Sequence, residues 1–156
     1  IDTTLIARPA HVERIAASGL QISGTRGDII VREHLTAVTH PAQVDRDIDY
    51  YILLTKVKDA AGALSDAAPI ADRIDCALSL QNGIGKEAAL IDCFGAGKVI
   101  GGSIIEGATL AAPGHIRHHV TVPFTAYFGE FNHARQDRYE RFAHRLTRPR
   151  LAARPC

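Results

Sequence analysis

The sequence contains no methionine and no tryptophan, and its 156 residues include only three cysteines. Because translation begins at methionine, a chain that starts at Ile1 and holds no Met is expected to have a trimmed or incomplete start. Cys76, Cys93 and Cys156 are odd in number, are widely spaced and form no CxxC pair. This usage favours reduced thiols over a disulfide framework. We therefore expect a cytoplasmic protein.

Long apolar runs and an excess of either charge are also missing. No run approaches the roughly 20 apolar residues that a membrane-spanning helix needs, so no membrane partner is expected. Lys and Arg total 18 against 17 Asp and Glu, which leaves no overall field to recruit nucleic acid. Seven arginines do lie between Arg135 and Arg154, with only Asp137 and Glu140 to balance them. A solvated helix face explains them, and a nucleic-acid-binding tail is the weaker alternative.

The first hundred residues alternate between strand-like and helix-like segments, which is typical of a parallel α/β sheet. The segment 49–55 (DYYILLT) is continuously apolar and therefore suits a strand that is covered on both faces. Gly19 is expected to end the first helix. The pattern predicts strands at 3–7, 28–31, 35–38, 49–55, 76–80 and 99–100, and helices from about 12 to 18, 60–68 and 86–94.

From Ser103 onward the pattern changes to strands at 103–110, 115–122 and 124–128, joined by short turns. Short turns imply antiparallel pairing. A helix is predicted from about 132 to 146, with Asn132 as its N-cap. We accordingly divide the chain into residues 1–131, a partial cofactor domain, and residues 132–156, a terminal helix with a basic tail that begins a further domain.

Three segments, in this order, resemble the 2-dehydropantoate 2-reductase (ketopantoate reductase) family. They are 5–8 (LIAR) before a helix, 49–59 (DYYILLTKVKD), and 80–87 (LQNGIGKE) with 101–114 (GGSIIEGATLAAPG) after it. The resemblance covers about residues 3–147, and Gln-Asn-Gly-x-Gly is its most specific part. It implies a Rossmann-type NADP-binding domain, in which a mostly parallel sheet carries an antiparallel extension.

Two parts of that family do not occur in the sequence. The family opens with a strand and a GxGxxG turn that holds the pyrophosphate at a helix N-terminus, and this element would precede Ile1. It also has an all-helical domain that supplies the general-acid lysine. The resemblance thus implies a domain without its first strand and glycine-rich turn, with no catalytic residue of its own. We expect the chain by itself to be inactive.

Two basic residues are candidates for binding the adenosine end of NADPH. Arg8 follows the second strand of the expected fold, where an arginine can pair with the 2′-phosphate of NADP. An ordinary surface arginine is the alternative. Lys56 stands at the carboxyl end of the 49–55 strand, where open parallel sheets bind ligands, and the resemblance implies that it contacts adenosine. Lys58 is the competing candidate, or else a solvated residue at a helix start.

Asn82 lies in a turn after the next strand. Gly83 and Gly85 let the backbone approach a ligand, and together with Gln81 they are expected to shape the turn. The amide of Asn82 can both donate and accept hydrogen bonds. The resemblance implies that it contacts the nicotinamide and the substrate together, while a purely structural turn asparagine is the alternative.

The segment around Ala108 offers weaker signals. Ala108 matches a family position whose backbone meets the cofactor, and Glu106 is expected to be an ordinary exposed residue without a catalytic role. His115, His118 and His119 cluster in sequence, but adjacent strand residues point to opposite faces, and no carboxylate or thiolate completes a metal site. We therefore expect no metal.

The expected reaction is hydride transfer from NADPH to the 2-keto group of 2-dehydropantoate, which gives pantoate for pantothenate synthesis. The expected partner is a small 2-keto acid, and a homodimer is left open. Two alternatives stay open as well. The same fold could act on another 2-keto acid, or the chain could be a degraded reductase that is kept only as a non-catalytic dinucleotide-binding module.

Overall fold

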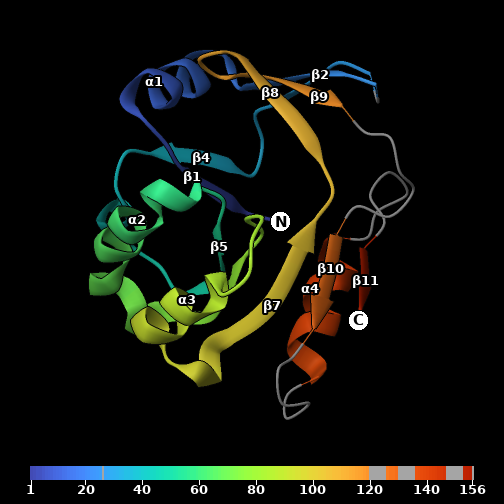
Figure 1. The fold of residues 1–156 in the computed structure, drawn as a ribbon. Helices are drawn as coiled ribbons and strands as arrows, with labels where there is room; N and C mark the ends of the chain where they lie inside the picture. The colour runs from blue at the N-terminus through green and yellow to red at the C-terminus, as the bar shows by residue number, and fades with distance from the viewer. Residues whose placement is uncertain (26, 120–125, 130–135, 147–152, 156) are drawn as a thin grey trace. The chain divides into compact units, whose positions relative to one another are not determined.

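The computed structural model describes residues 1–25, 27–119, 126–129, 136–146 and 153–155 (Figure 1). The chain forms two compact units. The first combines Ile1–Val44 with Glu106–Val122, and the second combines Asp45–Ile105 with Pro123–Cys156. The boundary expected after residue 131, between a cofactor domain and a further domain, is a different division and stays a prediction.

In the first unit, β1 (Thr3–Ile6) pairs in parallel with β4 (Leu35–Val38), and α1 (Pro9–Ser18) follows β1. Pro9 takes the first helical position, where its missing N–H costs nothing. Gly19 has φ 80° and donates its backbone N–H to the carbonyl of Ile15, so the helix ends where the sequence predicted. A short 3-10 helix, η1 (Pro41–Gln43), completes this part.

The first unit also holds a four-stranded sheet in the order β3-β2-β9-β8. Strands β8 and β9 pair antiparallel across a short turn, as the sequence predicted. Strand β2 runs parallel to β9, a pairing between distant segments that the sequence pattern did not indicate. The four strands are β2 (Leu20–Gly24), β3 (Ile29–Val31), β8 (Gly107–Ala112) and β9 (His115–His119).

The sheet of the second unit has the order β11-β10-β7-β6-β5. Strands β5, β6 and β7 are parallel, and β10 is antiparallel to β7, which confirms a mostly parallel sheet with an antiparallel extension. Strand β11, which the sequence did not predict, runs parallel to β10. The strands are β5 (Ile48–Leu53), β6 (Ile74–Ser79), β7 (Val99–Ile104), β10 (Ala126–Gly129) and β11 (Ala153–Pro155).

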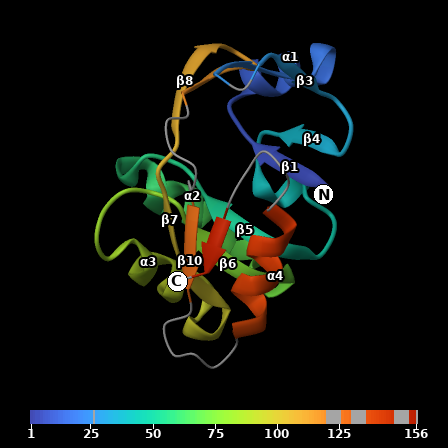
Figure 2. The ribbon, with the colours of Figure 1, turned by 90° about the vertical axis from the view of Figure 1, so that its right-hand side faces the viewer.

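Helices cover both faces of this sheet (Figures 1 and 2). On one face, α2 (Ala60–Ala67) and α3 (Lys86–Phe94) pack with Tyr51, Leu53 and Ala77. On the other face, α4 (Gln136–Leu146) packs with Tyr50, Ile52 and Leu78, and the Phe142 ring lies 4.6 Å from that of Tyr50. Strand β5 thus has apolar side chains in both cores, as its unbroken apolar run predicted. Three 3-10 helices connect the elements: η2 (Val57–Asp59), η3 (Ala68–Arg73) and η4 (Ala96–Lys98).

One strand prediction needs correction, and parts of other predictions stay open. The segment 103–110 was expected to be one strand, but β7 ends at Ile104 and β8 begins at Gly107, and the two strands belong to different sheets. The break falls at the boundary between the units. The proposed N-cap Asn132 and the ends of the predicted strands at 120–125 lie outside the described residues. No helix in the described ranges is long and apolar enough to cross a membrane.

Candidate functional site

Arg8 occupies the junction between β1 and α1 in the first unit. It is the N-cap residue of α1, with an extended backbone at φ −63° and ψ 151°, and its carbonyl accepts hydrogen bonds from the N–H groups of His11 and Val12. Its side chain is exposed and pairs with no other residue that the structure describes. The first turn of α1 contains no acidic residue. An exposed guanidinium beside a helix N-terminus suits an anion.

Lys56 follows β5 in the second unit and is the N-cap residue of η2. Its side chain is exposed. Lys58, the competing candidate, is also exposed, but its Nζ lies 3.6 Å from the carboxylate of Asp59. A lysine without a carboxylate neighbour is the better placed of the two to meet an added ligand.

The turn that carries Asn82 connects β6 to α3. Gly83 and Gly85 have φ of 121° and 78°, values that side-chain-bearing residues rarely adopt. A Cβ added at either glycine would meet no atom within 4 Å, so the backbone here is open to an approaching ligand. Asn82 itself is exposed, and so is the apolar side chain of Ile84.

Hydrogen bonds from Gln81 join this turn to the end of β5. Its side-chain Nε2 donates to the carbonyl oxygen of Thr55 at 2.6 Å, directly before Lys56. The buried Ser79 hydroxyl donates to Gln81 Oε1 and accepts from the Gln81 backbone N–H, both at 3.2 Å. The segments of Lys56 and Asn82 are therefore brought together at the carboxyl edge of the sheet.

Lys86, which the sequence analysis did not single out, holds the same turn from its other end. Its Nζ donates to the carbonyl of Gln81 at 2.8 Å and to the carbonyl of Gly102 in β7. A cation at the first position of a helix opposes the helix dipole. That conflict is the sequence signal that could have marked Lys86 as having a role outside its helix.

Ala108 lies on exposed strand β8 of the first unit, opposite His118 of β9. Arg8 and Ala108 thus belong to one unit, while Lys56 and Asn82 belong to the other. Within the first unit, Arg8 and Ala108 stand on different elements, and β8 pairs with β9 rather than with β1.

The expectation that Glu106 is exposed is wrong, while the expectation that it has no catalytic role stays a prediction. Its side chain is only 13% exposed, and its Oε2 lies 2.6 Å from Nε2 of His118. A carboxylate therefore does approach one histidine of the cluster, because Glu106 directly precedes β8, which pairs with β9. The other two histidines go elsewhere: His115 meets the Ser23 hydroxyl at 2.9 Å, and His119 meets Thr109 at 3.2 Å. Among the described residues, no three metal-ligating side chains gather.

The two described cysteines are buried to different degrees. Cys76 is fully buried in β6, whereas Cys93 in α3 is half-buried. The Sγ of Cys93 donates to the Leu64 carbonyl at 3.5 Å, and burial raises the pKa of its thiol. A raised pKa leaves less reactive thiolate near neutral pH.

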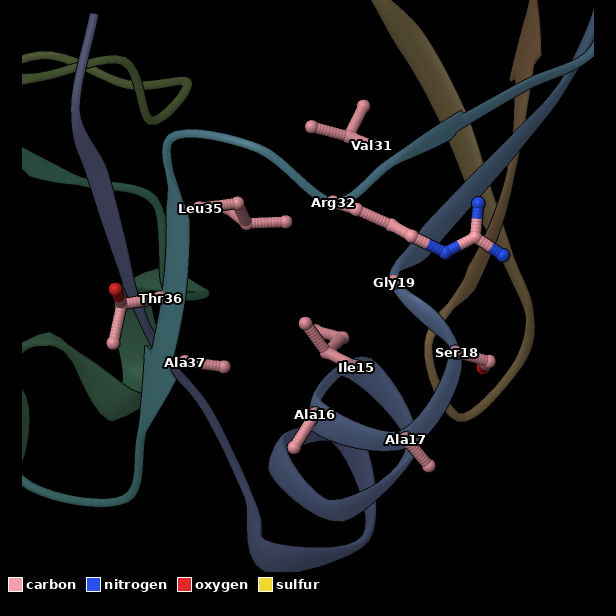
Figure 3. Close-up of a pocket in the computed structure, with 10 residues that line it drawn as sticks. All are labelled: Ile15, Ala16, Ala17, Ser18, Gly19, Val31, Arg32, Leu35, Thr36 and Ala37. Atoms are coloured by element: carbon pink, nitrogen blue, oxygen red, sulfur yellow. The ribbon is translucent and has the colours of Figure 1, made fainter.

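A pocket of about 300 Å³ lies in the first unit (Figure 3). The C-terminal half of α1, the end of β3 and strand β4 line it, chiefly with aliphatic side chains such as Ile15 and Leu35. Arg32 is the charged residue among those that line it. None of the four predicted site residues contributes to this pocket.

Known proteins with similar sequences were found for most of the chain. A sequence model of the family described as ketopantoate reductase PanE/ApbA matches residues 1–133. A 2-dehydropantoate 2-reductase from Pyrococcus abyssi is 38% identical over 116 residues, which are 74% of this chain and 36% of that protein.

Solved structures share the fold over nearly the whole chain. The 2-dehydropantoate 2-reductase from Porphyromonas gingivalis matches with a TM-score of 0.82 and 27% identity, over 98% of this chain and 53% of that protein. A D-mandelate dehydrogenase, solved with NADH and anilino(oxo)acetate, matches with a TM-score of 0.82 and 22% identity, over 99% of this chain and 49% of that protein. The chain thus spans from about a third to half of the length of these relatives.

Proposed function

This chain belongs to the ketopantoate reductase family, and we propose that it forms the cofactor-binding part of an enzyme that reduces 2-dehydropantoate to pantoate with NADPH. The observation that carries the proposal is the hydrogen bond from Gln81 to Thr55, which joins the Asn82 turn to the segment of Lys56. Ligands of open parallel sheets bind at this carboxyl edge of the strands. The chain spans only part of its relatives, so cofactor, substrate and reaction are all proposed here for the whole protein.

The residues of the first unit suit the adenosine phosphate of NADPH. The guanidinium of Arg8 is exposed, is adjacent to a helix N-terminus and has no acidic neighbour in the first turn of α1. A planar guanidinium can bind a phosphate through two parallel hydrogen bonds, and its charge favours the 2′-phosphate of NADP over the 2′-hydroxyl of NAD. The exposed backbone of Ala108 is proposed to contact the cofactor as well.

The residues of the second unit suit the rest of the cofactor and the keto acid. Lys56 would bind the adenosine part, and the Asn82 amide would orient the nicotinamide and the substrate by donating to one and accepting from the other. The open space around Gly83 and Gly85 fits a ligand that comes close to the backbone. Bound NADPH would supply the hydride.

We assign the proton donor to a lysine outside these residues. Lys86, four residues after Asn82, donates to two backbone carbonyl oxygens, and we propose that it supports the turn rather than protonating a substrate. A GxGxxG turn, which the sequence does not contain, is likewise assigned to a strand outside residues 1–156. We propose that such a strand pairs with β5, which stands at the end of the described sheet with β6 as its neighbour. A homodimer also stays a prediction, to be tested by sedimentation.

The test is a steady-state assay of the protein expressed from its complete gene, with NADPH oxidation as the readout. We expect 2-dehydropantoate to give the highest kcat/KM among a panel of 2-keto acids, and residues 1–156 alone to give no turnover. Turnover by residues 1–156 alone would refute the assignment of the proton donor. Binding of NADPH by the complete protein without turnover of any keto acid would favour a non-catalytic module.

A second candidate is a reductase of a different 2-keto acid. The match to D-mandelate dehydrogenase favours it, because a protein with the same fold is named for a different substrate and was solved with NADH. That likeness, at 22% identity, extends to the fold alone. A higher kcat/KM with an aromatic 2-keto acid, or with NADH in place of NADPH, would support this candidate over the first.

A further inference from the structure

Lys86 is an unusual residue at the start of α3. Its side chain is only 10% exposed, and its ammonium donates to the carbonyl of Gln81 at 2.8 Å and to the carbonyl of Gly102. The carboxylate of Glu87 lies 3.8 Å away. Burying an ammonium is costly unless it is paired and hydrogen-bonded, and its position opposes the helix dipole. These carbonyl contacts offset the unfavourable placement.

The positions of the two acceptor carbonyls indicate the structural role of the Lys86 ammonium. Gln81 directly precedes Asn82, and Lys86 follows it at the far end of the turn, so the first hydrogen bond closes the turn upon itself. Gly102 belongs to β7, so the second hydrogen bond attaches the closed turn to the neighbouring strand. Lys86 thus connects both ends of the Asn82 turn to the sheet.

Packing gives this turn little other support within the described part of the chain. Added Cβ atoms at Gly83 and Gly85 would meet nothing within 4 Å, and the side chain of Ile84 is fully exposed. Glycine also gives the backbone more conformational freedom than any other residue. Hydrogen bonds at the base of the turn, rather than side-chain packing, must therefore restrict where Asn82 lies.

We propose that Lys86 is a positioning residue, which holds Asn82 where its amide can orient the cofactor and the keto acid. The proposal rests on the function proposed above, because it takes Asn82 to be a ligand-binding residue. Lys86 itself touches neither ligand. Its effect is on the geometry of the bound substrate, and small errors in that geometry are costly to the rate.

The chain offers a matched control in Lys98. Lys98 is half-buried in the second unit, and its Nζ donates to the carbonyl of Ala71 at 2.8 Å, away from the Asn82 turn. Lys→Met at either position keeps an unbranched side chain and removes three donors. The two substitutions therefore impose a similar loss, but only Lys86→Met releases the turn.

The first experiment measures kcat and KM in the protein expressed from its complete gene, for Lys86→Met, Lys98→Met, Asn82→Ala and the double variant Lys86→Met/Asn82→Ala. We expect Lys86→Met to lower kcat/KM for the keto acid by about tenfold or more, with a partial return in Lys86→Arg. Lys98→Met should leave kcat/KM unchanged. Because Lys86 acts through Asn82, its substitution should have little further effect in the Asn82→Ala background.

The outcomes separate the two proposals. An equal loss from Lys86→Met in both backgrounds, or no loss at all, would overturn the positioning role and leave the proposed reaction standing. No NADPH-dependent turnover by the unmodified protein would instead overturn the proposed function. In that case the NMR signals of the Gly83 and Gly85 backbone amides test the positioning role. A shift of these signals in Lys86→Met but not in Lys98→Met supports control of the turn by Lys86, and unchanged signals refute it. Lys86→Gln, which keeps a donor, replaces Lys86→Met if that variant does not fold.

Discussion

Arg8 is exposed at the start of α1, where we propose that it binds the 2′-phosphate of NADPH. Replacing Arg8 with alanine should weaken NADPH binding about ten- to a hundredfold, since a hydrogen bond to a charged group contributes roughly 1.5–3 kcal/mol. NADH binding should change little, because NADH has no 2′-phosphate. Titration of the complete protein with each nucleotide measures both effects, and Arg32→Ala serves as the control at another exposed arginine of the same unit. Equal weakening of both nucleotides would contradict the assignment.

Tyr51 is a residue whose burial makes stability depend on pH. Its ring packs on that of Phe94 with 5.2 Å between centroids, and burial raises the pKa of Tyr51 from 10.0 to about 12. The folded protein therefore keeps the phenol neutral where the unfolded chain ionises it. This contribution to stability is complete below pH 10 and is lost as the pH rises toward about 12.

The corresponding variant is Tyr51→Phe, which keeps the ring and removes the titrating hydroxyl. The free energy of unfolding, from urea denaturation at a series of pH values, should fall less steeply above pH 10 in this variant than in the unmodified chain. Tyr50, whose pKa burial also raises, should account for part of the slope that is left. Identical slopes in both proteins would show that Tyr51 ionises equally well in the folded state.

At the scale of elements, the parallel pairing of β2 with β9 depends on one close approach. Gly24 pairs with His118, has φ 134°, and would place an added Cβ 2.1 Å from the His118 carbonyl oxygen. Gly24→Ala should lower the free energy of unfolding by roughly 1–3 kcal/mol, because it adds backbone strain and forces the strands apart.

Gly62 provides the matched control for this prediction. It lies inside α2, and an added Cβ would meet no atom within 4 Å. Gly62→Ala should raise the free energy of unfolding by about 0.5–1 kcal/mol, because alanine loses less conformational freedom in a helix. Urea denaturation of the two variants measures both changes, and a similar sign for both would contradict the close approach at Gly24.

At the scale of the whole molecule, the two units differ in how much apolar surface they bury. Among the buried hydrophobic side chains that the structure describes, Ile15 and Val44 belong to the first unit and the rest belong to the second. The second unit contains two apolar clusters, one on each face of its sheet. Since local opening is easiest where few apolar contacts are broken, the first unit should open more readily.

Hydrogen exchange of backbone amides measures this difference. We expect amides of β2, such as that of Ile22, to exchange faster than amides of β6, such as that of Leu78, when both are hydrogen-bonded in their sheets. Bound NADPH should slow exchange around Arg8 and Asn82 if both contact it. Equal protection in both units without ligand would show that the chain opens only as a whole.

Local pattern in the sequence determined much of this protein. The spacing of apolar residues predicted most of the strands and helices, though not β11, Gly19 marked the end of α1, and Gly83 with Gly85 marked the open turn that carries Asn82. Such features depend on neighbouring residues and on the conformations that glycine alone adopts freely, so they can be read without a fold. The family resemblance named Arg8, Lys56, Asn82 and Ala108, whose roles are still predictions.

Tertiary structure alone decided which distant segments meet. The pairing of β2 with β9, the contact between Glu106 and His118, and the bonds from Lys86 to Gln81 and Gly102 all depend on how strands are ordered in the sheets. Apolar spacing tells which face of an element is buried, but not which other element covers that face or lies beside it. For the same reason the sequence treated 103–110 as one strand, although the chain leaves one sheet at Ile104 and enters another at Gly107.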